Sequence, residues 1–200
     1  MSKAVADEIL DLVREAGLVR PRDLKSAGVS GGALSQLARR GLLERVGRGL
    51  YAVPGTAPSE HRSLAEVSKR TPRGVICLLS ALSFHGLTTQ TPPDVWLAIG
   101  PKDRAPRPAG VRLRVVRVSG ESRHAGVETR VVESVPVRIY GVAKTVADCF
   151  KFRNKIGTDI AVEALRDCLE QRRCTADELT EYARVCRVSR VMRPYMEALA

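Results

Sequence analysis

Three helical patterns followed by a glycine-bounded hairpin occupy the first 55 residues, and this order constrains the fold more than any other feature. Residues 4–17 carry apolar side chains at helical spacing. A short helix is predicted to begin at Pro21, and a third helix covers 31–40. Two short strands within 42–53 then flank a Gly-Arg-Gly turn. Such an order predicts a winged helix-turn-helix.

The outer face of the third helix carries side chains suited to reading base edges. Gln36 can pair with adenine and Arg39 with guanine, whereas Ser35 can contact either a base or a phosphate. Arg40 and the arginines of the hairpin are predicted to contact the backbone or the minor groove. The complete set of predicted DNA contacts is Arg22, Ser30, Gly31, Ser35, Gln36, Arg39, Arg40, Arg45 and Arg48.

The charge distribution also favours a nucleic-acid partner. The chain carries a formal net charge of +11 and has a pI near 10.0. Between residues 20 and 53 the basic side chains are opposed only by Asp23 and Glu44, while the first helix is acidic. Positive charge is therefore concentrated where the fold would place double-stranded DNA. The alternative is a winged helix that binds protein, with solvated arginines.

The remaining residues predict an α+β domain, in which a small sheet is followed by a C-terminal helical set. This gives two domains, residues 1–55 and residues 56–200. The pattern indicates helices over 58–69 and 78–87, strands over 94–99, 111–118, 128–132 and 135–140, and helices over 142–153, 159–172, 176–186 and from 191 onward. A Pro/Arg-rich loop lies between residues 100 and 110.

Four sequence segments together resemble the AbiEi-type antitoxins. Two lie in the first domain, LVRPRDL at 18–24 and VGRGLY at 46–51. Two lie in the second domain, LSALSFHGLT at 79–88 and VRIYGVAKTVADCF at 137–150. The second pair is the more distinctive, and its occurrence in this order strengthens the resemblance, which spans nearly the whole chain.

The resemblance implies the antitoxin of a type IV (abortive-infection) toxin–antitoxin system. In such systems the winged helix represses the shared promoter by binding inverted repeats, and the second domain counters a nucleotidyltransferase-like toxin without forming a stable complex with it. The implied protein is cytoplasmic, is a monomer or a weak dimer in solution, has no cofactor and is not an enzyme.

His85, Lys144 and Asp148 are the candidate residues of the antitoxic domain. His85 ends an apolar helix, where packing or capping is the simpler explanation. Lys144 and Asp148 are four residues apart, so an intrahelical ion pair is the simpler explanation. The basic segment 102–123 either extends a nucleic-acid surface or is an ordinary solvated strand and loop.

Two other functions stay open, a plain transcription factor whose second domain binds a ligand or a protein, and a nucleic-acid-processing enzyme. Asp94 is available for a nuclease, but no Glu-x-Lys follows it on a neighbouring strand. The five cysteines include no Cys-x-x-Cys pair, so no metal site is expected. The acidic N-terminus is unlike a signal peptide, and the apolar run 75–84 is too short to span a membrane.

Overall fold

A computed structural model describes residues 2–55, 59–106 and 110–199. Its N-terminal part contains α1 (Lys3–Ala16), the 3₁₀ helix η1 (Pro21–Leu24), α2 (Gly31–Arg39) and the hairpin β1 (Glu44–Gly47) and β2 (Leu50–Ala52). Their apolar faces share one core, whose fully buried members include Val13, Leu34 and Leu37. Val19 exchanges two backbone hydrogen bonds of 2.9 Å with Tyr51, which adds a third short strand to the hairpin. This is the predicted winged helix-turn-helix.

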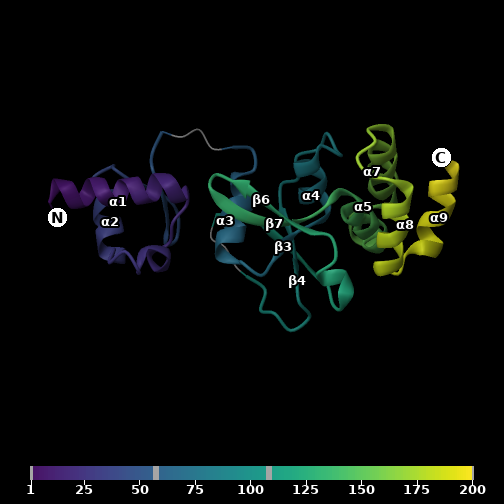
Figure 1. The fold of residues 1–200 in the computed structure, drawn as a ribbon, viewed down its shortest axis with the longest axis horizontal. Helices are drawn as coiled ribbons and strands as arrows, with labels where there is room; N and C mark the ends of the chain where they lie inside the picture. Colours follow the sequence, from purple (N-terminus) through teal and green to yellow (C-terminus); the bar gives the residue numbers. More distant parts are fainter. Residues whose placement is uncertain (1, 56–58, 107–109, 200) are drawn as a thin grey trace.

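A five-stranded mixed sheet forms the centre of the second domain (Figure 1). Its strand order is β5-β4-β3-β7-β6, with the bounds β3 Val75–Ile76, β4 Val95–Ile99, β5 Leu113–Arg117, β6 Val127–Val132 and β7 Val135–Tyr140. β3 pairs in parallel with β7 and antiparallel with β4, β4 pairs in parallel with β5, and β6 pairs antiparallel with β7.

The strands β3 and β4 are buried on both faces of the sheet, and successive residues of a strand point to opposite sides. On β4, for example, Leu97 packs into one apolar cluster and Trp96 into the other. The first cluster is covered by α3 (Arg62–Arg70). The second cluster is covered by α4 (Leu78–His85) and by the C-terminal helices.

The C-terminal helical set packs as one layer at the end of the molecule opposite α1 and α2 (Figure 1). It comprises α5 (Val142–Lys151), α6 (Arg153–Ile156), α7 (Thr158–Glu170), α8 (Ala176–Val185) and α9 (Ser189–Ala198). Thr175 and Glu178 form a capping box at the start of α8. Pro194 lies inside α9.

The winged helix is packed directly against the second domain. Leu18 and Leu50 belong to the same apolar cluster as Val135 of β7. Gly17, at φ +65°, lies so close to the turn between β6 and β7 that an added Cβ would sit 1.9 Å from the Glu133 carbonyl oxygen. This position therefore requires glycine, for its backbone conformation as well as for space.

The α+β class with an N-terminal winged helix and a C-terminal helical set is confirmed, and one central strand was missed. β3 has only two residues and leads directly into α4, so the sequence shows one apolar run over 75–84 instead of a strand and a helix. The short helix η2 (Glu121–Arg123) and α6 were also missed. The predicted helix start at Pro58 and part of the Pro/Arg-rich loop, Arg107 and Pro108, lie outside the described residues.

Candidate nucleic-acid interface

Helix α2, the third helix of the winged helix-turn-helix, presents an exposed polar face. Ser30 caps α2, because its Oγ accepts a hydrogen bond of 3.1 Å from the backbone N–H of Ala33. Leu34 and Leu37 hold the opposite face in the core. Gln36 and Arg39 are exposed, so both side chains are available to a groove.

Besides Ser30, two residues predicted to contact DNA lie against other parts of the winged helix. The Ser35 hydroxyl forms a hydrogen bond of 3.0 Å with the Tyr51 hydroxyl of β2, which ties the helix to the hairpin. A Cβ on Gly31 would lie 3.4 Å from the Pro21 ring, an ordinary contact distance, so packing against η1 does not by itself require glycine here. Ser35 would have to exchange its present partner in order to contact DNA.

The remaining predicted DNA contacts are exposed cations on η1, α2 and the hairpin. Gly49 makes the turn of the hairpin at φ +65°, a conformation that favours glycine, and Arg48 lies exposed beside it. Within the described residues, none of these cations forms an ion pair; they are Arg22, Arg39, Arg40, Arg45 and Arg48. Their charges are therefore free to neutralise phosphates.

Behind this surface, a charged network connects the winged helix to α3. The Asp23 carboxylate accepts hydrogen bonds from the Arg20 guanidinium, the shortest of 2.7 Å, and lies 3.3 Å from the Lys69 ammonium group. Burial alone would raise the pKa of Asp23, but the hydrogen bonds from Arg20 and the charge of Lys69 together lower it below its ordinary value. The network thus stabilises the contact between the two parts of the chain.

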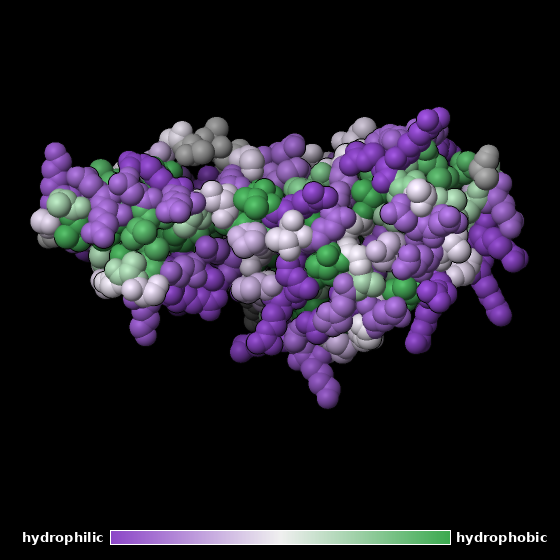
Figure 2. Space-filling view, in the orientation of Figure 1, coloured by the Kyte–Doolittle hydropathy of each residue, from purple (hydrophilic) through white to green (hydrophobic). Residues whose placement is uncertain are grey.

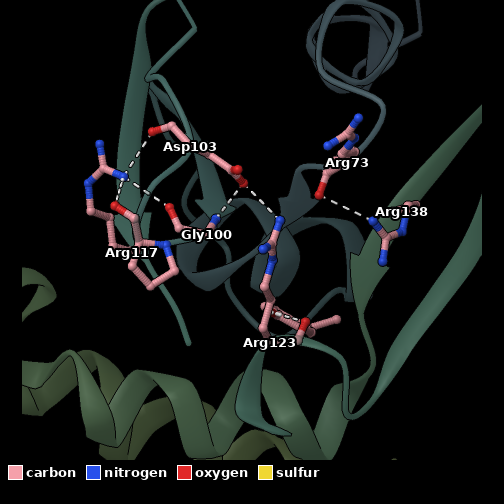
Figure 3. A network of polar contacts seen from close by, with 8 residues as sticks. Arg73, Gly100, Asp103, Arg117, Arg123 and Arg138 are labelled. Carbon is pink, nitrogen blue, oxygen red and sulfur yellow. Dashed lines mark hydrogen bonds and ion pairs between the residues drawn. The ribbon is translucent and has the colours of Figure 1, made fainter. Parts of the chain in front are cut away.

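Four arginines of the basic segment 102–123 form contacts within the chain, whereas Lys102 and Arg104 are exposed. Arg112 and Arg114 both bind Asp94, with N–O distances of 3.3 and 2.8 Å. Arg117 donates to the backbone carbonyl oxygens of residues 100, 101 and 103 at 2.6–2.9 Å (Figure 3). Arg123 forms an ion pair of 2.8 Å with Asp103.

His85 occupies an interior position. Its Nε2 lies 2.8 Å from the carbonyl oxygen of Tyr140, at the end of β7, and its side chain is buried. Burial lowers the pKa of His85, so the ring is neutral at pH 7 and Nε2 carries the proton that the carbonyl accepts. Thr145 of α5 donates to the same carbonyl oxygen at 3.0 Å, so His85 helps to join α4, β7 and α5.

Lys144 and Asp148 form the expected intrahelical ion pair, and the pair is almost completely buried, with exposed side-chain fractions of 0% and 1%. The Lys144 ammonium group also lies 3.9 Å from the ring centre of Tyr140. The Cys186 thiol donates to Asp148 Oδ1 at 3.3 Å, consistent with burial raising the pKa of Cys186 to about 11. Burial likewise raises the pKa of Asp148, with Lys144 acting against that shift. The three candidate antitoxic residues are thus interior groups.

Neither a metal-binding cluster nor a membrane-spanning helix is found in the described part of the chain. No three His, Cys, Asp or Glu side chains of these residues are gathered as metal ligands would be. None of the helices described combines the length and the apolar composition needed to cross a membrane.

Comparison with known proteins gives one family and one fold. Residues 7–54 match the family described as transcriptional regulator, AbiEi antitoxin. A crystal structure of the RV2827C protein from Mycobacterium tuberculosis superposes with a TM-score of 0.61 at 18% identity, covering 91% of this chain and 72% of that one. At this identity the likeness shows the fold alone. The comparison with curated proteins gave no match.

The family match covers α1, η1, α2 and the hairpin, which are the elements that carry the free cations described above. The predicted resemblance is confirmed for this segment, since residues 7–54 are similar to the AbiEi antitoxin transcriptional regulators.

Proposed function

We propose that the chain is a DNA-binding repressor that acts as the antitoxin of a type IV toxin–antitoxin system. Residues 1–55 would read the promoter, and residues 56–200 would counter the toxin. The observation that carries the proposal is the set of exposed, unpaired cations on the described winged helix, within a segment that matches the AbiEi regulators. The protein is then a cytoplasmic regulator whose action requires no catalysis.

In the proposed complex α2 lies in the major groove. Arg39 donates to guanine O6 and N7, and Gln36 forms two hydrogen bonds with adenine. Arg45 and Arg48 approach phosphates or the adjacent minor groove, because β2 of the hairpin contacts α2 through the Ser35–Tyr51 hydrogen bond. Inverted repeats place two copies on the operator, and the free protein is a monomer or a weak dimer.

The second domain would counter a nucleotidyltransferase-like toxin without forming a stable complex with it. His85, Lys144 and Asp148 contribute to this role indirectly, since they are buried and hold α4, α5 and β7 together. Loss of any of them is therefore expected to affect antitoxic activity through the fold of the domain.

Titration of the upstream DNA of the chain's own gene, against a scrambled duplex, tests the proposal. Arg39→Ala is expected to weaken specific binding by about 1–3 kcal/mol, because one bidentate base contact is lost. Arg193→Ala is the matched control, since Arg193 is also exposed on a helix but pairs with Glu197 at 3.6 Å. Equal affinity of the wild type for both duplexes, or no effect of Arg39→Ala, would contradict the proposal.

Co-expression with the neighbouring toxin gene separates the two activities. Arg39→Ala is expected to keep full rescue from the toxin while promoter repression is lost. If this variant loses rescue while it remains folded, the division of labour between the two parts of the chain is wrong.

A further inference from the structure

A basic hollow lies in the C-terminal half of the molecule, away from the recognition helix. It has a volume of about 670 Å³ and lies between the loop that contains η2 and the helices α5, α6, α8 and α9. Helices α8 and α9 lie at the opposite end of the long axis from α2 (Figure 1). A volume of this size is typical of small-molecule sites.

Four cations line the hollow, from α5, α6, α8 and the α8–α9 connection: Lys151, Arg153, Arg184 and Arg187. Glu121 is the carboxylate among the lining residues. Lys151 donates to the Ser122 hydroxyl at 3.3 Å and Arg153 to the Phe150 carbonyl oxygen at 2.9 Å. These partners are neutral, and over residues 2–55, 59–106 and 110–199 none of the four cations forms an ion pair. Their charge is thus available to an anion, in contrast to that of Arg112, Arg114 and Arg123.

A series of buried polar contacts begins at Ser122 and Cys186, which line the hollow. The Ser122 hydroxyl lies 3.7 Å from the Cys186 sulfur, and Cys186 in turn donates to Asp148, the partner of Lys144. Since the charges of Lys144 and Asp148 compensate each other, this series of contacts adds rigidity without adding net charge.

Hydrophilic side chains cover much of the face seen in Figure 2, including the end of the molecule formed by the C-terminal helices.

Arg187 is held in an unfavourable backbone conformation at the hollow. It follows α8 at φ +59°, where the backbone N–H of Val188 bonds to the Ala183 carbonyl oxygen at 2.8 Å and that of Arg187 to Arg184 at 3.0 Å. This is the Schellman geometry that strongly favours glycine. An arginine at this position is less stable than a glycine would be, and its side chain lines the hollow.

Three valines, Val185, Val188 and Val191, provide an apolar part of the lining beside these cations. Guanidinium groups match phosphate oxygens in geometry and charge, and an apolar wall suits the base or the sugar of a nucleotide. We propose that this hollow binds a nucleotide through a di- or triphosphate group, either free or at the 5′ end of an RNA. The proposal is independent of DNA reading by the winged helix.

Arg187→Gly tests the site without disturbing the fold. Glycine suits the left-handed conformation, so the melting temperature is expected to stay level or rise. Arg172→Gly is the matched control, because Arg172 has φ +52° at the same Schellman position after α7 and is not among the residues that line the hollow. Calorimetric titration uses pyrophosphate, ATP and GTP as probes.

We expect all three probes to bind the wild type, and Arg187→Gly to weaken binding about tenfold or more, since a charge-assisted contact is lost. Arg172→Gly should bind as the wild type does. The proposal is overturned if millimolar pyrophosphate and nucleotides do not bind, if Arg187→Gly has no effect, or if both variants weaken binding equally, which would indicate diffuse electrostatic attraction.

Titrations with RNA and DNA distinguish a free nucleotide from the 5′ end of an RNA as the source of the phosphates. Stronger binding of 5′-triphosphate RNA than of free nucleotides would assign the site to an RNA end, and the reverse would assign it to a free nucleotide. If 5′-hydroxyl RNA or duplex DNA binds as tightly, with the same dependence on Arg187, the hollow is a general polyanion surface and the proposal is wrong. Arg39→Ala should leave pyrophosphate binding unchanged, so failure of the hollow and failure of DNA reading are distinguishable.

Discussion

The winged helix and the segment 102–123 are both rich in arginine, but they use it differently. On the described winged helix, the arginines of α2 and the hairpin are exposed and have no carboxylate partner. In segment 102–123, Arg112, Arg114 and Arg123 pair with aspartates, and Arg117 binds carbonyl oxygens. Net charge alone therefore overstates the area that is able to bind nucleic acid.

The largest effect is expected at the buried pair Lys144–Asp148 in α5, because these charges stabilise the fold and are not available to a ligand. Lys144→Met is expected to lower the free energy of unfolding by about 3–5 kcal/mol, since Asp148 would remain buried without its partner. The double variant Lys144→Met, Asp148→Leu should lose less. Chemical denaturation measures both, and a double variant less stable than the single one would contradict this account.

The loss of stability in Lys144→Met is expected to depend on pH. Burial raises the pKa of Asp148 above the ordinary value of 3.8, so ionisation of this carboxyl group opposes folding as the pH rises through that range. Without Lys144, the loss of stability should be largest at neutral pH and should shrink in acid.

The Asp23 network provides a smaller test, at the contact between the two regions. Asp23→Asn is expected to lower the free energy of unfolding by about 1 kcal/mol at pH 7, because it removes hydrogen bonds to Arg20 and the pairing with Lys69. The pKa of Asp23 is lowered in the folded state, so its stabilisation is present above about pH 4 and is lost as the pH falls further. Denaturation of wild type and variant should therefore converge in acid; a constant difference would show that the charge is not the cause.

The order of elements in the winged helix was predictable because caps, glycines and apolar spacing all act locally there. Ser30, Gly49 and the apolar face of α2 specify the helix and the hairpin within a few residues of sequence. β3 was not predictable in this way, since its two residues become a central strand only through pairing with β4 and β7.

The site residues show the same division between local and long-range causes. Exposure of Gln36 and Arg39 followed from helical periodicity, whereas the bond between Ser35 and Tyr51 depends on how the hairpin packs on α2. The basic hollow had no sequence signal, because Ser122, Lys151 and Arg187 are distant in the chain and meet only in the folded domain.

The salt dependence of operator binding tests most directly whether free cations, and not total charge, bind DNA. Two matched double variants are compared with the wild type, Arg45→Ala, Arg48→Ala in the hairpin and Arg112→Ala, Arg114→Ala on β5 and its preceding loop. Each phosphate contact adds about 0.9 to the slope of log K against log salt. We predict that the hairpin double variant reduces the slope by about 2 and that the β5 double variant leaves it unchanged. An equal reduction in both would contradict the account.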